Sequence, residues 1–256
     1  MRPQSLEEAW ELNQKKRNRV VAGMMWLKMG THSFNTAIDL CDLGLDAIEE
    51  TEDEFRIGAM ATLRQMEKHP GLGVYSCGAV EDALRDIVGV QFRNGATLGG
   101  SLWRRMGFSD VVAIFLAMDS SVELFKGGVV PLEEFVRMPY DNDILVRLIV
   151  KKRPGSFAYQ AVRKQRTDLP TLNCAAAKVG EEYRVVVGSR PARAMLLRDE
   201  RGILADGITE ESAAAFADYA AGAVPVSGNM WGSAEYRRAL VPVLVRRTLL
   251  ALGEVR

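Results

Sequence analysis

Cysteine and histidine are scarce in this sequence, and their positions leave little room for metal chemistry. The 256 residues include three cysteines, Cys41, Cys77 and Cys174, and two histidines, His32 and His69. No Cys-x-x-Cys pair is present, so a zinc site or an iron–sulfur cluster lacks its usual ligand spacing. Scattered cysteines in odd number also predict a reducing compartment. We expect no metal site, and we interpret His32 as a surface residue or a core residue with satisfied polar atoms.

The sequence also lacks an excess of either charge and lacks long apolar runs. Its 33 basic residues balance 33 acidic ones, and no basic stripe with interleaved aromatics indicates a nucleic-acid partner. No stretch approaches the roughly 20 apolar residues of a membrane span. Residues 1–11 are polar and acidic, unlike a secretory signal. We therefore expect a cytoplasmic globular protein that binds neither nucleic acid nor membrane.

The sequence does contain an α+β pattern, and its 256 residues are enough for more than one domain. Ser5 and Glu8 have the spacing of a capping box at the start of a helix that runs to about Asn13. Apolar, β-branched and alternating runs predict strands, and helical periodicity predicts helices. In a first lobe, about 1–55, and a second, 56–152, the expected elements are strands at 20–22, 38–40, 55–57, 121–125 and 144–150, helices at 79–88 and 111–118, and a glycine-rich loop at 95–101.

A C-terminal domain, 153–256, is predicted after the segment Lys151-Lys-Arg-Pro-Gly155, because this segment combines charge with a Pro-Gly turn. Pro242 stands inside the last predicted helix, where its missing N–H donor and its ring predict a kink or a delayed start. The expected elements of this domain are strands at 172–179 and 183–187 and helices at 212–221 and 233–252.

The segment Arg93-Asn-Gly-Ala-Thr-Leu-Gly-Gly-Ser101 is the best candidate for a binding site. Adjacent glycines let backbone N–H groups approach an anion, and a neighbouring hydroxyl can donate as well, which suits a pyrophosphate. A tight turn with glycines at positive φ accounts for the same pattern, so local chemistry leaves both alternatives open. Arg104 and Arg105 follow, and they either steer a dinucleotide phosphate or form a solvated basic turn.

The same segment resembles the Asn-x-Ala-Thr-(Ile/Val)-Gly-Gly-Asn-Ile signature of the FAD subunits and FAD domains of molybdenum hydroxylases, such as xanthine dehydrogenase and carbon monoxide dehydrogenase. Other pieces match that family in the same order: Val20-Val-Ala-Gly23, Phe55-Arg-Ile-Gly-Ala-Met-Ala-Thr-Leu63, Ser109-Asp110, Arg193-Ala194 and Ser233-Ala-Glu-Tyr-Arg237. The resemblance implies a two-lobed flavin-binding domain of the PCMH type, followed by a small α+β C-terminal domain.

The resemblance also implies noncovalent FAD. The implied cofactor-binding residues are Val20, Val21, Ala22, Gly23, Met24, Met25, Ile87, Ala96, Thr97, Gly99, Gly100, Ser101, Asp110, Leu145 and Gln160. Among them, the segment from Thr97 to Ser101 would line the pyrophosphate with backbone donors and the Thr97 hydroxyl. Asp110 would accept from flavin-side hydroxyls, and it also suits the N-cap of the helix that begins at Val111. Both roles are compatible.

The sequence departs from the family pattern at several of these positions. Met24, Met25 and Trp26 stand where the family has Gly-Thr-Asp, and they either contact the cofactor or plug the core. Ser101 replaces Asn, with a shorter reach. Ile87 and Leu145 match apolar positions beside the isoalloxazine, although core packing is the default for such residues. Gln160 replaces a Lys, which would lower the flavin reduction potential.

By resemblance, the chain would pass electrons from the [2Fe–2S] clusters of one partner subunit through FAD to NAD or another acceptor, while a molybdopterin subunit oxidises the organic substrate. Two alternatives stay open. One is a scaffold subunit with a degenerate flavin site, suggested by the departures at Met24, Met25, Trp26 and Ser101. The other is a free-standing FAD oxidoreductase, for which no acid–base pair is recognisable.

Overall fold

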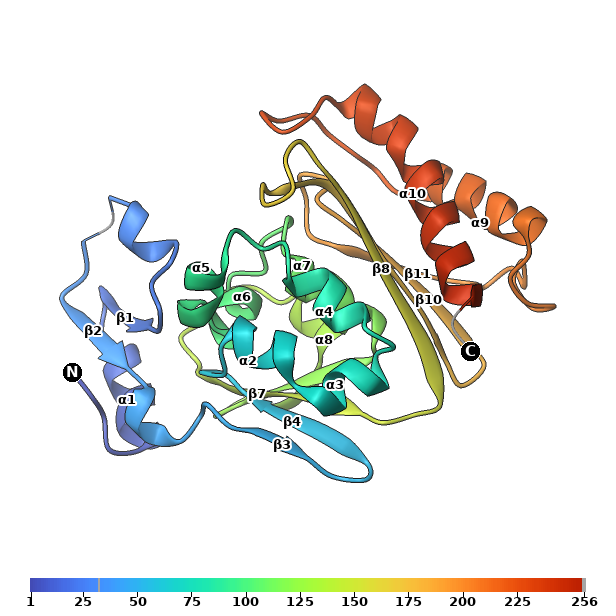
Figure 1. Ribbon diagram of the computed structural model, residues 1–256. Helices are drawn as coiled ribbons and strands as arrows, with labels where there is room; N and C mark the ends of the chain where they lie inside the picture. The colour runs from blue at the N-terminus through green and yellow to red at the C-terminus, as the bar shows by residue number, and fades with distance from the viewer. Residues whose placement is uncertain (32, 255–256) are drawn as a thin grey trace.

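The computed structural model describes residues 1–31 and 33–254, so the interpretation of His32 lies outside the described residues. Three β-sheets organise the fold: a two-stranded sheet near the N-terminus, a five-stranded sheet in the middle and a four-stranded sheet near the C-terminus. Figure 1 shows these as successive bodies, with the N-terminal lobe at one side and the last two helices at the other. The α+β class predicted from the sequence is confirmed.

The first lobe is small. Helix α1 (Leu6–Asn13) packs beside two parallel strands, β1 (Asn18–Val21) and β2 (Thr36–Asp39), and short 3₁₀ turns η1 (Leu27–Met29) and η2 (Cys41–Leu43) lie in its connections. Ser5 caps α1 by accepting from the Glu8 N–H at 3.1 Å. The Glu8 carboxylate accepts instead from the Gln4 N–H at 2.7 Å, so the reciprocal half of the predicted capping box is displaced by one residue.

The second lobe contains an antiparallel sheet of order β3-β4-β7-β5-β6. Its strands are β3 (Ile48–Glu50), β4 (Glu54–Gly58), β5 (Ser120–Leu124), β6 (Gly128–Pro131) and β7 (Leu145–Lys151). Because the β3–β4 hairpin belongs to this sheet, a lobe boundary at about residue 55 would divide the hairpin. The first lobe therefore ends before Ile48, and the earlier boundary is corrected.

Seven helices of the described chain lie in the second lobe: α2 (Leu63–Lys68), α3 (Pro70–Tyr75), α4 (Ala79–Leu84), α5 (Val90–Gly95), α6 (Leu98–Trp103), α7 (Asp110–Ala117) and α8 (Leu132–Phe135). The helix predicted at 79–88 ends at Leu84. The predicted loop at 95–101 is wrong, because the segment is the junction of α5 and α6. Glycine disfavours a helix interior, but the cap that Thr97 places before Leu98 starts a new helix regardless.

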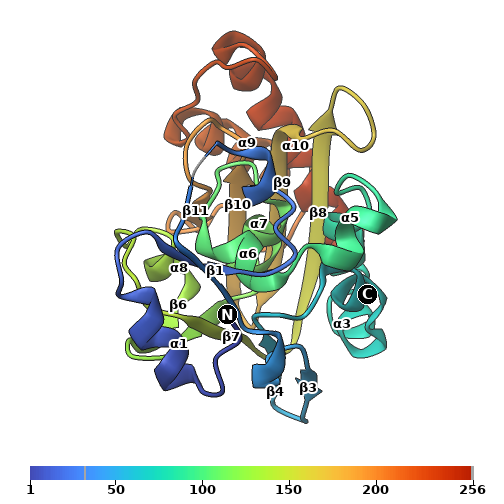
Figure 2. The same cartoon turned by 90° about the vertical axis from the view of Figure 1, so that its left-hand side faces the viewer.

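The C-terminal domain is an antiparallel sheet with two helices. Its strands are β8 (Gly155–Arg163), β9 (Pro170–Val179), β10 (Glu182–Gly188) and β11 (Met195–Arg198), and its helices are α9 (Glu210–Ala223) and α10 (Ala234–Glu254). Helix α10 begins at Ala234 and continues through Pro242, so the delayed start is wrong. In Figure 2 the strands run side by side, and α9 and α10 cover the sheet at the top.

Both faces of this C-terminal sheet are covered. Helices α4 and α7 pack on one face and α10 on the other. Alternate residues of β9 therefore enter two different cores: Ala175 and Ala177 face α7, whereas Cys174 and Ala176 face α10. This double burial explains why β9 is apolar almost throughout.

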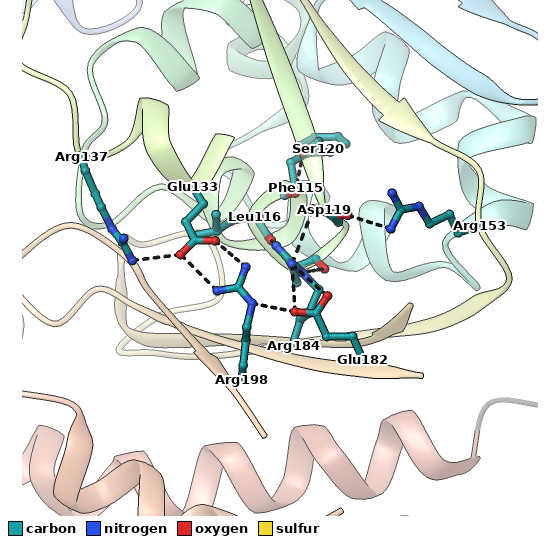
Figure 3. A network of polar contacts seen from close by, with 11 residues as sticks. Phe115, Leu116, Asp119, Ser120, Glu133, Arg137, Arg153, Glu182, Arg184 and Arg198 are labelled. Atoms are coloured by element: carbon teal, nitrogen blue, oxygen red, sulfur yellow. Dashed lines mark hydrogen bonds and ion pairs between the residues drawn. The ribbon is translucent and has the colours of Figure 1, made fainter. Parts of the chain in front are cut away.

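A polar clasp joins this sheet to the second lobe (Figure 3). The Arg184 guanidinium on β10 donates to the carbonyls of Ala117 at 3.1 Å and Leu116 at 3.0 Å, which the C-terminal end of α7 leaves unpaired. Arg198 on β11 donates to Glu182 at 2.6 Å and to Glu133 of α8 at 2.5 Å. The clasp fixes α7 and α8 against the C-terminal sheet.

Candidate functional site

The first lobe meets the second where two glycines touch. A Cβ built on Gly23 would lie 1.7 Å from the carbonyl oxygen of Gly95, so no side chain fits at position 23. Gly23 follows β1, and Gly95 is the last residue of α5. The structure thus brings the loop after Val20, Val21 and Ala22 onto the α5–α6 junction, as the family resemblance implied. We call this contact the loop junction.

The three residues that depart from the family pattern lie beside this junction in different surroundings. Met25 is half-buried and packs on the main core, where its Cε is 2.3 Å from a Cβ built on Gly95. Met24 and Trp26 are 41% and 46% exposed, so a core plug describes Met25 only. Trp26 contacts Phe92 and Phe108, with ring centroids 6.1 and 5.8 Å away.

Met24 adopts φ +52°, a left-handed conformation that favours glycine. The family has its second glycine at this position. Met24 therefore carries a side chain in a backbone conformation that glycine adopts freely, at a cost of order 1 kcal/mol.

The start of α6 is stabilised from within the protein. The Thr97 hydroxyl oxygen accepts from the Gly100 N–H at 3.2 Å. The N–H groups of Leu98 and Gly99 donate to the carbonyls of Ala61 and Ala59, at 2.9 and 2.8 Å. These amides are committed to internal bonds, so the hydroxyl proton of Thr97 is the principal side-chain donor that the junction offers. At Leu98 and Gly99 the segment therefore has the structural role of a tight local fold, which was one of the two alternatives for this pattern.

The two adjacent glycines serve different purposes. A Cβ on Gly99 would lie 2.8 Å from the Ala59 carbonyl oxygen, so Gly99 is required by packing against the chain before α2. Gly100 is exposed, and its built Cβ meets only the Thr97 hydroxyl oxygen at 3.3 Å. Ser101 donates its hydroxyl proton to the Thr97 carbonyl at 2.8 Å, which directs it away from any ligand. Close approach of an anion is thus possible at Gly100, while Ala96 and Leu98 are buried beneath it.

A buried ion pair holds α5 in place behind the junction. Arg93 donates to Glu67 of α2 at 2.7 Å and to the Ile87 carbonyl at 3.1 Å. Arg64 donates to the other Glu67 oxygen at 2.7 Å. Burial acts against ionisation, but the hydrogen bonds from Arg93 and Arg64 outweigh it and lower the pKa of the Glu67 carboxyl. The partly buried Ile87 side chain packs on the main core, and Arg93 holds the Ile87 backbone through its carbonyl.

Asp110 is the centre of a buried network between the second lobe and the C-terminal domain. Its Oδ1 accepts from the Tyr159 hydroxyl and from Asn173 Nδ2 at 2.8 Å, and its Oδ2 accepts from Arg163 at 2.9 Å. Burial and the Asp110 charge raise the pKa of Tyr159 well above its ordinary value, so this hydroxyl stays protonated. The N-cap of α7 is Ser109, not Asp110, and Asp110 is the first helical residue.

Sequence reasoning missed Tyr159, Arg163 and Asn173. The alternation of β8 was the available signal, because it places residues 157, 159, 161 and 163 on the face toward α7. The same alternation turns Gln160 to the opposite face, where its Nε2 lies 3.5 Å from the Arg247 carbonyl of α10. Gln160 is therefore not brought to the loop junction, and its place beside the flavin stays a prediction. Leu145 is buried in the main core, in keeping with the default for apolar residues.

Arg104 and Arg105 do not form a solvated basic turn. Arg104 is exposed, but Arg105 is 3% exposed, and its guanidinium carbon lies 3.9 Å from the centroid of the Phe135 ring. Within residues 1–31 and 33–254, no group of three or more His, Cys, Asp or Glu side chains is arranged to hold a metal ion. No helix in this part of the chain is both long and apolar enough to cross a bilayer.

Comparison with known proteins identifies the family. The family described as "FAD binding domain in molybdopterin dehydrogenase" matches residues 1–152, and "CO dehydrogenase flavoprotein C-terminal domain" matches residues 157–252. The chain belongs to the molybdopterin dehydrogenase flavoprotein family. This family accounts for both the two-lobed FAD-binding fold and the C-terminal sheet.

Relatives of this flavoprotein match it over nearly the whole chain. The nicotine 6-hydroxylase medium subunit of Paenarthrobacter nicotinovorans is 26% identical, covering 98% of this chain and 95% of the relative. Protein YgfM of Escherichia coli K12 is 25% identical, covering 95% and 92%. The solved carbon monoxide dehydrogenase from Hydrogenophaga pseudoflava has the same fold, with a TM-score of 0.86 at 24% identity, covering 98% of this chain and 95% of that one.

The residues of the loop junction fit the FAD that the family implies. An exposed glycine with no Cβ obstructing it, at Gly100, adjoins a hydroxyl whose proton is not engaged in an internal bond, at Thr97. Within the described residues, the side chains placed at the junction, from Met24 to Trp26 and from Thr97 to Ser101, include no His, Cys or Tyr. Such a surface suits a phosphate held by hydrogen bonds and offers no nucleophile for a covalent flavin link.

Proposed function

We propose that this chain is the FAD-binding electron-transfer subunit of a molybdenum hydroxylase complex, in which it holds FAD noncovalently at the loop junction. The observation that carries the proposal is the contact of Gly23 with Gly95, which places the first-lobe loop over the capped start of α6. The family membership and the fit of Thr97 and Gly100 to a pyrophosphate support it.

In this proposal each part of the junction has its own task. The Thr97 hydroxyl would donate to the pyrophosphate, and Gly100 would let it approach the backbone. Gly23 would keep the first loop close enough to cover the cofactor. Met25 would exclude water from the space beneath the cofactor, because its side chain already fills the space beside Gly95. The buried Asp110 network would hold the C-terminal domain at a fixed distance from α6 and α7.

Bound FAD supplies the exchange between one-electron donors and a two-electron acceptor. We propose that the donors are [2Fe–2S] clusters of one partner subunit, that a molybdopterin subunit oxidises the organic substrate, and that NAD or another acceptor takes the electrons. The medium subunit of nicotine 6-hydroxylase is by its name one subunit of a larger enzyme, which supports the need for partners. Electron entry and exit then both depend on the surface around the junction.

The first experiment asks whether the isolated chain binds FAD. The purified protein, saturated with FAD, is denatured and filtered, and we expect all flavin absorbance in the filtrate. Absorbance retained by the denatured chain would contradict noncovalent binding. A protein that remains colourless after addition of FAD would instead support the scaffold alternative.

The second experiment tests the direction of electron flow. The FAD-loaded chain is mixed anaerobically with NADH, with purines or with aldehydes while the flavin absorbance is followed. We expect no bleaching by purines or aldehydes, because their oxidation is assigned to another subunit. Bleaching by NADH would support a nicotinamide acceptor through the reverse reaction. Bleaching by the organic substrates would overturn the electron-relay proposal in favour of a free-standing oxidoreductase.

A further inference from the structure

A cationic cavity lies at the opposite end of α6 from the loop junction. Its volume is about 290 Å³, and it is enclosed by the segment after α6, by Tyr140 and by the strand ends and loops of the C-terminal domain. Four arginines line it: Arg104, Arg105, Arg193 and Arg237. No acidic side chain of the described residues lines it, and none of these arginines forms an ion pair within that part of the chain.

Two buried polar side chains of the cavity wall have an atom without a partner. Arg105 Nη2 and Ser189 Oγ make no hydrogen bond within the described protein, although their residues are only 3% and 4% exposed. A buried donor that is left unpaired costs about 1 to 3 kcal/mol, and more when it is charged. Both residues line the same cavity.

The other cations of the wall are neutralised by carbonyl dipoles rather than by carboxylates. Arg193 donates to the carbonyls of Val136 at 2.7 Å and Met138 at 3.3 Å. Arg237 donates to Thr171, Ser189, Ser227 and Gly232 carbonyls and to the Asn229 side chain. Burial lowers the pKa of Arg105 and of Arg237, and no carboxylate of the cavity wall opposes this shift.

Arg105 is held in a fixed position to receive a ligand. Its Nε donates to the Phe135 carbonyl at 2.8 Å, and its guanidinium lies 3.9 Å from the Phe135 ring centroid and 4.9 Å from that of Tyr140. Tyr140 is 59% exposed, and its hydroxyl donates to the Arg104 carbonyl. The negative charge of Asp141 raises the pKa of Arg105 and so opposes the effect of burial. Asp141 is exposed, however, and it forms no ion pair with Arg105 in the described structure.

We propose that this cavity is a second anion site, distinct from the flavin junction, and that it binds a small tetrahedral oxyanion of the phosphate type. Such an anion offers several acceptor atoms, and arginine guanidinium groups recognise it with paired hydrogen bonds. Because Arg105 Nη2 is buried, the anion would reach it only after the side chains around the guanidinium move. Arg104, which is exposed at the rim, supplies the first electrostatic contact.

The test uses the full chain saturated with FAD and inorganic phosphate as the probe. Phosphate is titrated at constant ionic strength, with sodium chloride as the balancing salt, and binding is followed by calorimetry and by the thermal unfolding midpoint. We expect saturable binding and a rising midpoint. Arg104→Ala should raise the phosphate Kd about tenfold, the loss of one charge-assisted hydrogen bond. Arg238→Ala, which removes an exposed arginine of α10 beyond the cavity, should leave it unchanged.

Ser189→Gly provides a second variant that keeps the fold. Ser189 has φ +58°, which glycine adopts freely, so the CH₂OH side chain is removed without adding backbone strain. We expect weaker phosphate binding with an unchanged FAD content. Equal phosphate affinity in Arg104→Ala and Arg238→Ala, or a response reproduced by chloride alone, would overturn the proposal. The titration is repeated with the FAD-free chain: phosphate binding seen only without FAD would show that the anion site is the flavin site itself, and would contradict a separate site without affecting the proposed function.

Discussion

Gly23 and Gly95 come from different lobes, yet their backbones touch so closely that a Cβ on Gly23 would lie 1.7 Å from the Gly95 carbonyl oxygen. Gly23→Ala should therefore push the first loop away from α6 and lower FAD affinity by roughly an order of magnitude, about the loss of one hydrogen bond to a charged group. FAD titration measures this. Gly73→Ala is the matched control, because a Cβ there meets nothing within 4 Å. Equal affinity in the two variants would show that the loop contact does not matter for FAD.

The adjacent glycines of α6 should respond in opposite ways. Gly100→Val should abolish FAD binding while the fold persists, because position 100 is exposed and meets only Thr97. Gly99→Ala should instead destabilise the fold by about 1 to 3 kcal/mol, the usual cost of overpacking, since its Cβ would strike Ala59. FAD content and urea unfolding distinguish these effects. Full FAD occupancy in Gly100→Val would show that the start of α6 is not part of the cofactor site.

Met24→Gly should stabilise the protein. Met24 has φ +52°, and a non-glycine residue in that region costs of order 1 kcal/mol. Glycine removes this strain, although it also gains entropy in the unfolded chain, so the net gain should be below about 1 kcal/mol. The measurement is the urea unfolding midpoint, with FAD affinity followed in parallel. A loss of FAD affinity in this variant would show that the Met24 side chain contacts the cofactor.

Asp110→Ala should lower the free energy of unfolding far more than the loss of an exposed ion pair does. It leaves the buried Arg163 without its acidic partner, which typically costs about 3 to 5 kcal/mol. Asp86→Ala breaks the Arg166–Asp86 pair, in which the Arg166 side chain is largely exposed, and should cost about 1 kcal/mol or less. Urea unfolding compares the two. If Asp110→Ala kept wild-type stability but lost FAD, Asp110 would be a cofactor contact rather than a domain anchor.

The Glu67 carboxyl should make stability depend on acid pH. Its pKa is lowered from 4.5 in the folded state, so the ionised form stabilises the fold. That contribution is complete above pH 4.5 and is lost as the pH falls through the folded pKa. Glu67→Gln should therefore be destabilised most near neutral pH, by about 3 kcal/mol, and should approach the wild type in acid. Unfolding at several pH values tests this, and a difference that is constant with pH would contradict it.

Local patterns predicted several strands and the long helices well because these arise from near neighbours, but they missed β3, β6, β8 and β11. The apolar run of α7 was predicted at 111–118 and is observed at Asp110–Ala117. Patterns failed where a contact from far along the chain decides the outcome. The assignment of the β3–β4 hairpin depends on its pairing with β7, nearly a hundred residues later, and the α5–α6 junction depends on the cap at Thr97 overriding two glycines.

The candidate site was predicted in part for the same reason. The resemblance indicated the segments that meet at Gly23 and Gly95, but the direction of each side chain depends on tertiary packing. Gln160 therefore faces α10 and Ser101 turns back to Thr97. The partners of Asp110 come from β8 and β9, and no local spacing in the sequence relates them to α7. The boundary after residue 152 stays a prediction.

The helix α7 is buried at all eight of its positions, and β9 and β10 of the C-terminal domain supply much of its cover. Evolution therefore cannot exchange the C-terminal domain as an independent module, because a substitution on β9 that enlarges a side chain toward α7 must be matched by a smaller one on that helix. Covariation between these two elements should be strong across the family. The seam between α7 and these two strands is thus one shared core, and a change of side-chain volume on either side must be absorbed by the other.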